Sequence, residues 1–152
     1  MVGVRFSQAQ VREVLGLEPE TIRHWRKALP ALAGRPRKAA YEHADLLAIA
    51  IVKRLVRNLG FPISQIASID EELFSLCRTT PWPQLSRCRL RVEVGDTIKL
   101  EPLGAPADLG TAAIVLLPLG PIIAELSSRL LGPARLQEEL RFPLSAQASR
   151  QS

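Results

Sequence analysis

The sequence is poor in the residues from which disulfides and metal centres are built. Its 152 residues include only two cysteines, Cys77 and Cys88, and two histidines, and no CxxC spacing occurs. Two thiols do not make a disulfide framework, and a four-ligand zinc site needs a larger set of Cys and His residues at short spacings. We therefore expect two reduced cysteines in a cytoplasmic protein that needs no metal and no other cofactor.

Long apolar runs are missing as well. The longest stretch without a charged side chain, residues 109–124, has 16 residues and contains Pro118, Gly120 and Pro121. A membrane-spanning helix needs about 20 consecutive apolar residues. The first residues also lack the charged start, apolar run and small-residue cleavage site of a secretory signal. We expect no membrane partner.

Positive charge is present in excess, but only in one part of the chain. Residues 1–60 carry 11 basic and 5 acidic side chains, a net charge of +6, whereas residues 61–152 carry 9 and 10, a net charge of −1. Residues 23–38 hold six basic side chains and no acidic one. Such a local excess indicates an anionic partner. The six basic residues of this segment are Arg23, Arg26, Lys27, Arg35, Arg37 and Lys38.

The first 30 residues predict two short helices. Residues 7–15 have an apolar face at helical spacing, and Ser7 can cap their first turn. Gly16 breaks this helix. A second helix begins at Pro19, since proline is tolerated at the first helical position, and it ends near Pro30. Its apolar side includes Trp25, which we expect in the core.

Two further helices are expected before residue 80. Residues 31–41 form a basic loop, called the wing below, because glycine and proline prevent a helix there. Apolar residues at helical spacing then predict a third helix over 42–59. A fourth helix is expected from residue 63 to residue 77, with Ser64 as its cap.

The pattern changes after Pro81 and Pro83. Residues 88–94 and 97–100 alternate apolar and polar side chains around a Gly-Asp turn, which predicts a β-hairpin. Residues 111–117 predict a buried strand, and 121–131 a helix that ends at a Gly-Pro pair.

These patterns predict the α+β class. We expect an N-terminal four-helix winged helix-turn-helix followed by a small module of β-hairpin, strand and helix. The expected domains are residues 1–80, residues 84–132 and a flexible tail, 133–152.

Two short helices joined by a glycine-containing turn and followed by a basic loop are typical of a winged helix-turn-helix. The second helix can enter the major groove, where base edges present a readable pattern of donors and acceptors. The basic wing can contact phosphates or the adjacent minor groove. The local net charge of +6 should make such binding depend on salt.

The residues also resemble a known family. Residues 11–26 read Val-Arg-Glu-Val-Leu-Gly-Leu-Glu-Pro-Glu-Thr-Ile-Arg-His-Trp-Arg and are similar to the MerR-type DNA-binding domain, in which a helix, a turn and Thr-Leu-Arg-Tyr-Tyr-Glu follow one another. The resemblance continues through Tyr41, the Asp-Leu pair at 45–46 and the Leu-Gly-Phe motif within 51–66. It spans about residues 5–69. No single element is diagnostic, but the ordered set is specific.

The resemblance implies a set of DNA contacts on the second helix and the wing. Thr21 and Arg23 occupy recognition positions, and His24 stands where an aromatic usually contacts the backbone. Arg26 replaces the usual acidic residue, which adds phosphate affinity. Ala39 replaces the usual wing arginine, so nearby basic residues are expected to take over. The full expected set is Thr21, Arg23, His24, Arg26, Lys27, Arg35, Arg37, Lys38 and Tyr41, the last with its ring packed and its hydroxyl open to a phosphate.

The chain departs from the family after the fourth helix. In the family a long helix after the fourth usually forms the dimer, and here Pro81 and Pro83 would end such a helix. We therefore do not transfer the family's activation mechanism, which needs that dimer. We expect a non-enzymatic, sequence-specific regulator of transcription from a bacterium or phage that binds duplex DNA. It should form a homodimer through the C-terminal module, with the apolar residues 111–131 as candidate interface. Another regulator or RNA polymerase is a candidate further partner.

Two alternative hypotheses remain open. The first is an excisionase-like architectural DNA-binding protein of a phage or mobile element. The second is an adaptor whose helix-turn-helix binds protein.

Overall fold

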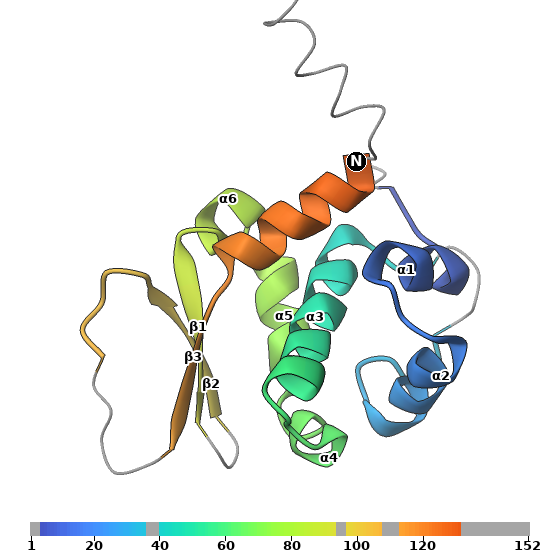
Figure 1. Cartoon of the computed structure of the whole chain (residues 1–152), viewed down its shortest axis with the longest axis horizontal. Coiled ribbons are helices and arrows are strands. Elements are labelled where there is room, and N and C mark those ends of the chain that lie inside the picture. The colour runs from blue at the N-terminus through green and yellow to red at the C-terminus, as the bar shows by residue number, and fades with distance from the viewer. Residues whose placement is uncertain (1–3, 36–39, 94–96, 108–112, 132–152) are drawn as a thin grey trace, which may run out of the picture.

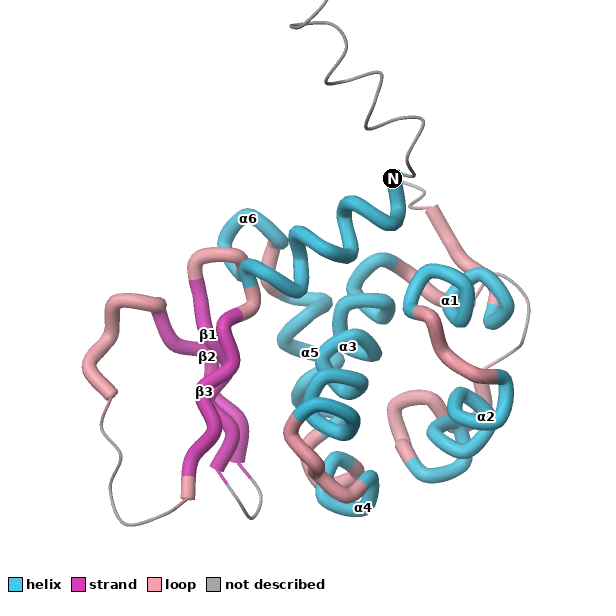
Figure 2. The backbone as a smooth tube through the Cα atoms, in the orientation of Figure 1, coloured by secondary structure: helices cyan, strands magenta, loops and turns pink. Residues whose placement is uncertain are grey.

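The computed structural model describes residues 4–35, 40–93, 97–107 and 113–131. A bundle of helices forms one side of the molecule and a small antiparallel sheet forms the other (Figures 1 and 2). The helices are α1 (Gln8–Leu15), α2 (Pro19–Ala28), α3 (His43–Lys53), the π-helical turn η1 (Arg54–Asn58), α4 (Ile63–Ile66), α5 (Asp70–Thr79) and α6 (Trp82–Leu85). The strands are β1 (Cys88–Glu93), β2 (Thr97–Pro102) and β3 (Ile114–Pro118), and a last helix covers residues 120–131.

The first two helices confirm the sequence prediction. The hydroxyl of Ser7 accepts a hydrogen bond from the Gln10 backbone N–H, and the Gln10 side chain accepts one from the Ser7 N–H, which makes a capping box. Gly16 ends α1 with a φ of 64°, a left-handed conformation that glycine adopts without a steric cost. Pro19 occupies the first position of α2, and Leu29 is its C-cap. The Gly16 turn therefore joins two well-terminated helices.

The third helix has the predicted extent but an altered end. After α3, residues 54–58 wind as a single π-helical turn, and Gly60 follows with a φ of 75°. The Phe61 N–H donates to the Leu55 carbonyl at 3.0 Å across this turn. Two of its residues reach the surface: Arg54 is partly exposed and Arg57 is exposed.

The predicted fourth helix over residues 63–77 is wrong as a single element. The chain forms α4 and α5 in its place, with a break at residues 67–69. Ser64 is not a cap: it lies inside α4, and Pro62 occupies the N-cap position.

The start of α5 explains this break. Asp70 is fully buried, and its carboxylate accepts a hydrogen bond from the Ala31 N–H at 2.8 Å, in the segment that follows α2. Glu71 and Glu72 complete an acidic first turn, which favours the positive end of a helix. A contact 39 residues away in sequence therefore sets where α5 begins.

The sheet has the strand order β2-β1-β3, and both pairs are antiparallel. The pairing of β1 with β2 confirms the predicted hairpin, while the expected turn at residues 95–96 is outside the described residues. β3 corrects a second expectation. It lies at the sheet edge, and its residues 114–117 are half-buried rather than buried. An edge strand has a neighbouring strand on one side only, so its side chains are less completely covered than those of a central strand.

The helix at residues 120–131 crosses from the sheet toward α1 (Figure 1). It buries Ile122, Ile123 and Leu126 in the same hydrophobic core that holds α3 and α5. The apolar face of this helix is therefore used within the chain. In the part of the chain that the structure describes, no helix has both the length and the apolar character needed to cross a membrane. The division into residues 1–80 and 84–132 remains a prediction.

Candidate nucleic-acid interface

Helix α2 has one buried face and one exposed basic face. Ile22 and Trp25 are 0% and 3% exposed, so the predicted core position of Trp25 is confirmed. Arg23, His24 and Lys27 are exposed, because helical spacing turns them away from those two anchors. The helix lies on the side of the molecule away from the sheet (Figure 1). It therefore presents two cations and an imidazole to solvent.

Arg57 extends this basic face, and the sequence analysis missed it. Its guanidinium donates to the hydroxyl of Thr21 at 3.3 Å, although 36 residues separate the two in sequence. Arg57 is exposed, and Thr21 is half-buried. The signal in the sequence is the basic run of residues 53–57, which contains no acid. Only the contact of Arg57 with Thr21 shows that this run reaches α2.

Arg26 is engaged inside the protein. One of its terminal nitrogens donates to the side-chain oxygen of Gln8 at 3.0 Å, and the other donates to the backbone carbonyl of Arg35. The side chain is half-buried. Arg26 thus ties α2 to α1 and to the beginning of the wing. Two donors of Arg26, for which the sequence predicts a phosphate contact, are thus engaged within the protein.

Arg35 is held at the start of the wing by a buried carboxylate. It forms an ion pair with Asp45 at 2.7 Å, and Asp45 also accepts a hydrogen bond from the Glu42 N–H at 2.9 Å. The Arg35 guanidinium lies 5.7 Å from the centre of the Tyr41 ring. Two expected wing contacts, Arg37 and Lys38, are outside the described residues.

Tyr41 packs as expected, but its hydroxyl is closed to a phosphate. The residue is 0% exposed, and its backbone pairs with that of Phe6. Burial raises the pKa of the phenol, against the opposing influence of Arg26 and Arg35. Its hydroxyl has no hydrogen-bond partner among the described residues. The structure thus places the Tyr41 ring in the core, at the end of the wing.

The two cysteines are free thiols in different environments. Burial raises the pKa of the Cys77 thiol to about 12, so the thiol stays protonated at neutral pH. Cys88 is half-buried, and its Sγ donates to the Gln84 carbonyl. Within the described ranges, no group of three or more His, Cys, Asp or Glu side chains is placed to hold a metal ion.

The N-terminal geometry has a counterpart among known families. Residues 6–73 match the family model described as MerR HTH family regulatory protein. These residues are a MerR-type helix-turn-helix domain. No curated protein and no solved structure shows a significant match to the chain.

The matched range begins at Phe6, which pairs with Tyr41, and ends within α5. The MerR-type domain therefore includes the basic face of α2 and its support by Arg26 and Arg35. Such a domain indicates a DNA-binding regulator of transcription, and the family is generally non-enzymatic. The sheet and the helix at residues 120–131 lie outside the matched range.

Proposed function

We propose that this protein regulates transcription by binding duplex DNA in a sequence-specific manner through α2. The observation that carries the proposal is the exposed face of α2, on which Arg23, His24 and Lys27 stand opposite the buried anchors Ile22 and Trp25. A helix held by one face can present the other to the major groove. This role places the protein in the cytoplasm, at the nucleoid.

The proposed contacts differ in what they recognise. Arg23 is the candidate for base readout, because a guanidinium can bond guanine through two donors. Lys27 and Arg57 are candidates for phosphates, which hold the helix in place without reading sequence. Thr21 and His24 complete the proposed set, together with Arg37 and Lys38 of the wing.

Arg26, Arg35 and Tyr41 are proposed to position the reading surface. Arg26 joins α1, α2 and the wing, and Arg35 joins the wing to α3 through Asp45. A recognition helix must keep its orientation for several contacts to form together. We expect changes at these residues to weaken binding to all DNA sequences alike.

We also propose that the protein is a homodimer through β3. This strand is at the sheet edge, and its apolar side chains at 114–117 are all half-buried. An apolar edge strand is a template for pairing with another chain. Two copies of β3 that pair antiparallel would give a two-fold interface and double the DNA site. Light scattering should give twice the chain mass, and a charged substitution, Leu116→Lys, should give the monomer.

Fluorescence anisotropy with labelled genomic fragments tests the DNA proposal. The variant Arg23→Ala with Lys27→Ala should lose about 1–3 kcal/mol of binding free energy for each contact removed. The loss of Lys27 should also reduce the slope of log affinity against log salt concentration by roughly one, because one phosphate contact is removed. Arg78→Ala is the matched control, because Arg78 is exposed on α5, outside the proposed surface.

Three results would contradict this function. Affinity that is indifferent to both sequence and salt would exclude specific DNA binding. DNA bending with cooperative filling of adjacent sites would favour the excisionase-like architectural protein. Failure to retain any DNA, together with a stable protein partner, would favour the adaptor.

A further inference from the structure

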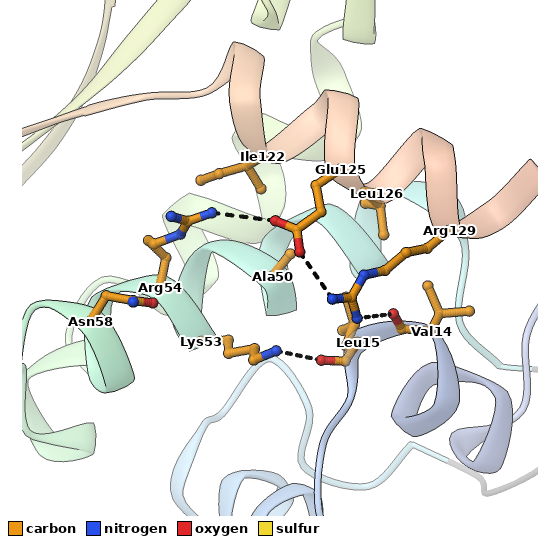
Figure 3. Close-up of a pocket in the computed structure, with 10 residues that line it drawn as sticks. All are labelled: Val14, Leu15, Ala50, Lys53, Arg54, Asn58, Ile122, Glu125, Leu126 and Arg129. Carbon is orange, nitrogen blue, oxygen red and sulfur yellow. Dashed lines mark hydrogen bonds and ion pairs between the residues drawn. The ribbon is translucent and has the colours of Figure 1, made fainter.

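A cavity lies between the helix-turn-helix and the last helix (Figure 3). Its volume is about 240 Å³, and it has walls from α1, α3, η1 and the helix at residues 120–131. Drug-sized ligands occupy pockets of about 300–1,000 Å³, so this cavity suits a smaller molecule.

The walls of this cavity carry more positive than negative charge. Lys53, Arg54 and Arg129 line it, together with one carboxylate, Glu125. Glu125 lies 3.5 Å from Arg54 and 3.0 Å from Arg129, so a single carboxylate is shared by two guanidinium groups. Lys53 donates to the uncharged carbonyl of Leu15 at 2.6 Å. The lining therefore has a net charge of +2, counted over these four side chains.

Donors remain available for a bound anion. A lysine ammonium has three N–H donors and a guanidinium has five. Arg129 uses one terminal nitrogen for the Val14 carbonyl and the other for Glu125. The side chains of Arg54, Glu125 and Arg129 are 37%, 53% and 44% exposed, so a ligand can reach them from solvent. The pKa of Lys53 is lowered by burial and by neighbouring cations, which agrees with uncompensated positive charge.

The rest of the wall is apolar. Leu15, Ile122 and Leu126 are buried side chains that face the cavity, and Val14 and Ala50 stand beside them. A phosphodiester backbone has no group that would use this apolar surface. A ligand with one anionic group and a compact apolar body would use both parts.

We propose that this cavity binds a small organic anion, a carboxylate or phosphate attached to a compact apolar group. Glu125 occupies the position of the anionic group in the free protein, and the ligand replaces it between Arg54 and Arg129. The cavity adjoins the turn between α1 and α2, since a side chain at Gly16 would meet the Arg129 guanidinium at 3.5 Å. The proposal does not depend on DNA binding by α2.

NMR titration of the full chain with benzoate tests the site. Benzoate should shift the backbone amides of Gly16 and Lys53 to saturation, whereas the uncharged analogue benzyl alcohol should not. Arg54→Gln should weaken benzoate binding roughly fivefold or more, since it removes a charged donor. Glu125→Gln should tighten it, because the internal carboxylate no longer competes. Arg78→Gln, at an exposed position of α5, is the control and should leave the affinity unchanged.

Several results would overturn the proposal. Equal shifts with benzoate and benzyl alcohol would show apolar binding alone. Unchanged affinity in Arg54→Gln, or weaker binding in Glu125→Gln, would exclude the proposed exchange of carboxylates. If a short DNA duplex displaces benzoate and Arg54→Gln weakens duplex and benzoate equally, the cations contact a DNA phosphate. Because benzoate binding is measured without DNA, its failure is separate from failure of the DNA proposal.

Discussion

The ion pair between Arg35 and Asp45 should hold the start of the wing against α3, and its removal is a measurable perturbation. The two charged atoms are 2.7 Å apart, and the side chains are 21% and 5% exposed. Breaking a fully buried pair costs about 3–5 kcal/mol, whereas an exposed pair contributes about 0–1 kcal/mol. Since Arg35 is partly exposed, we expect Arg35→Gln to lower the free energy of unfolding by about 2 kcal/mol.

The chain offers a matched control in Arg5, which pairs with Glu42 at 3.7 Å. Those side chains are 59% and 49% exposed. Arg5→Gln should change the free energy of unfolding by no more than about 0.5 kcal/mol. Thermal unfolding should show a midpoint about 4–8 °C lower for Arg35→Gln, at about 2–4 °C per kcal/mol for a chain of this size.

A double-mutant cycle then isolates the pair itself. Asp45→Asn keeps an acceptor for the Glu42 N–H and removes the charge. The double variant Arg35→Gln with Asp45→Asn should cost at least about 1 kcal/mol less than the sum of the single changes. Each single change leaves the charge of its partner unpaired, whereas the double variant leaves no unpaired charge. Additive costs, or a loss in Arg35→Gln as small as that in Arg5→Gln, would refute the reasoning.

Three further predictions concern the buried residues Cys77 and Asp70. Cys88 should react with a thiol reagent before Cys77, because burial raises the pKa of Cys77 to about 12 and limits access; equal rates in the folded protein would contradict this. Asp70→Ala should lower the free energy of unfolding by about 1–3 kcal/mol, since the Ala31 N–H loses its acceptor, whereas Asp70→Asn retains one. Burial also raises the pKa of the Asp70 carboxyl above its usual 3.8. The contribution of Asp70 to the free energy of unfolding is therefore most favourable below pH 3.8, and it falls as the pH rises through the raised pKa. The stability of the native chain relative to Asp70→Asn should therefore decline with rising pH in urea titrations between about pH 3.5 and 6, and a rise would contradict the shift.

Local signals in the sequence were sufficient where neighbouring residues decide the structure. The capping box at Ser7, the left-handed Gly16 and Pro19 at the first turn of α2 depend on side chains within a few residues of one another. The hairpin depends on alternation along two adjacent strands. The family resemblance depends on the same short motifs, and the match over residues 6–73 confirms it.

Sequence patterns failed where a distant contact decides the structure. The break before α5 depends on Asp70 and Ala31, which are 39 residues apart. Arg26 was expected at a phosphate because it is a cation on the second helix, and only the tertiary structure shows that two of its donors are engaged by Gln8 and the Arg35 carbonyl. A count of basic residues cannot separate cations that face solvent from cations that hold the fold together.

The sequence by itself determined the α+β class, the paired helices and the concentration of basic charge in the first 60 residues, because each depends on local composition and spacing. Only the tertiary structure decided which cations reach the surface of α2, that Arg57 joins them, and that the last helix encloses a cation-lined cavity against the helix-turn-helix. The last two features arise from contacts that packing makes across 36 to 115 residues of chain, a separation that no local pattern records.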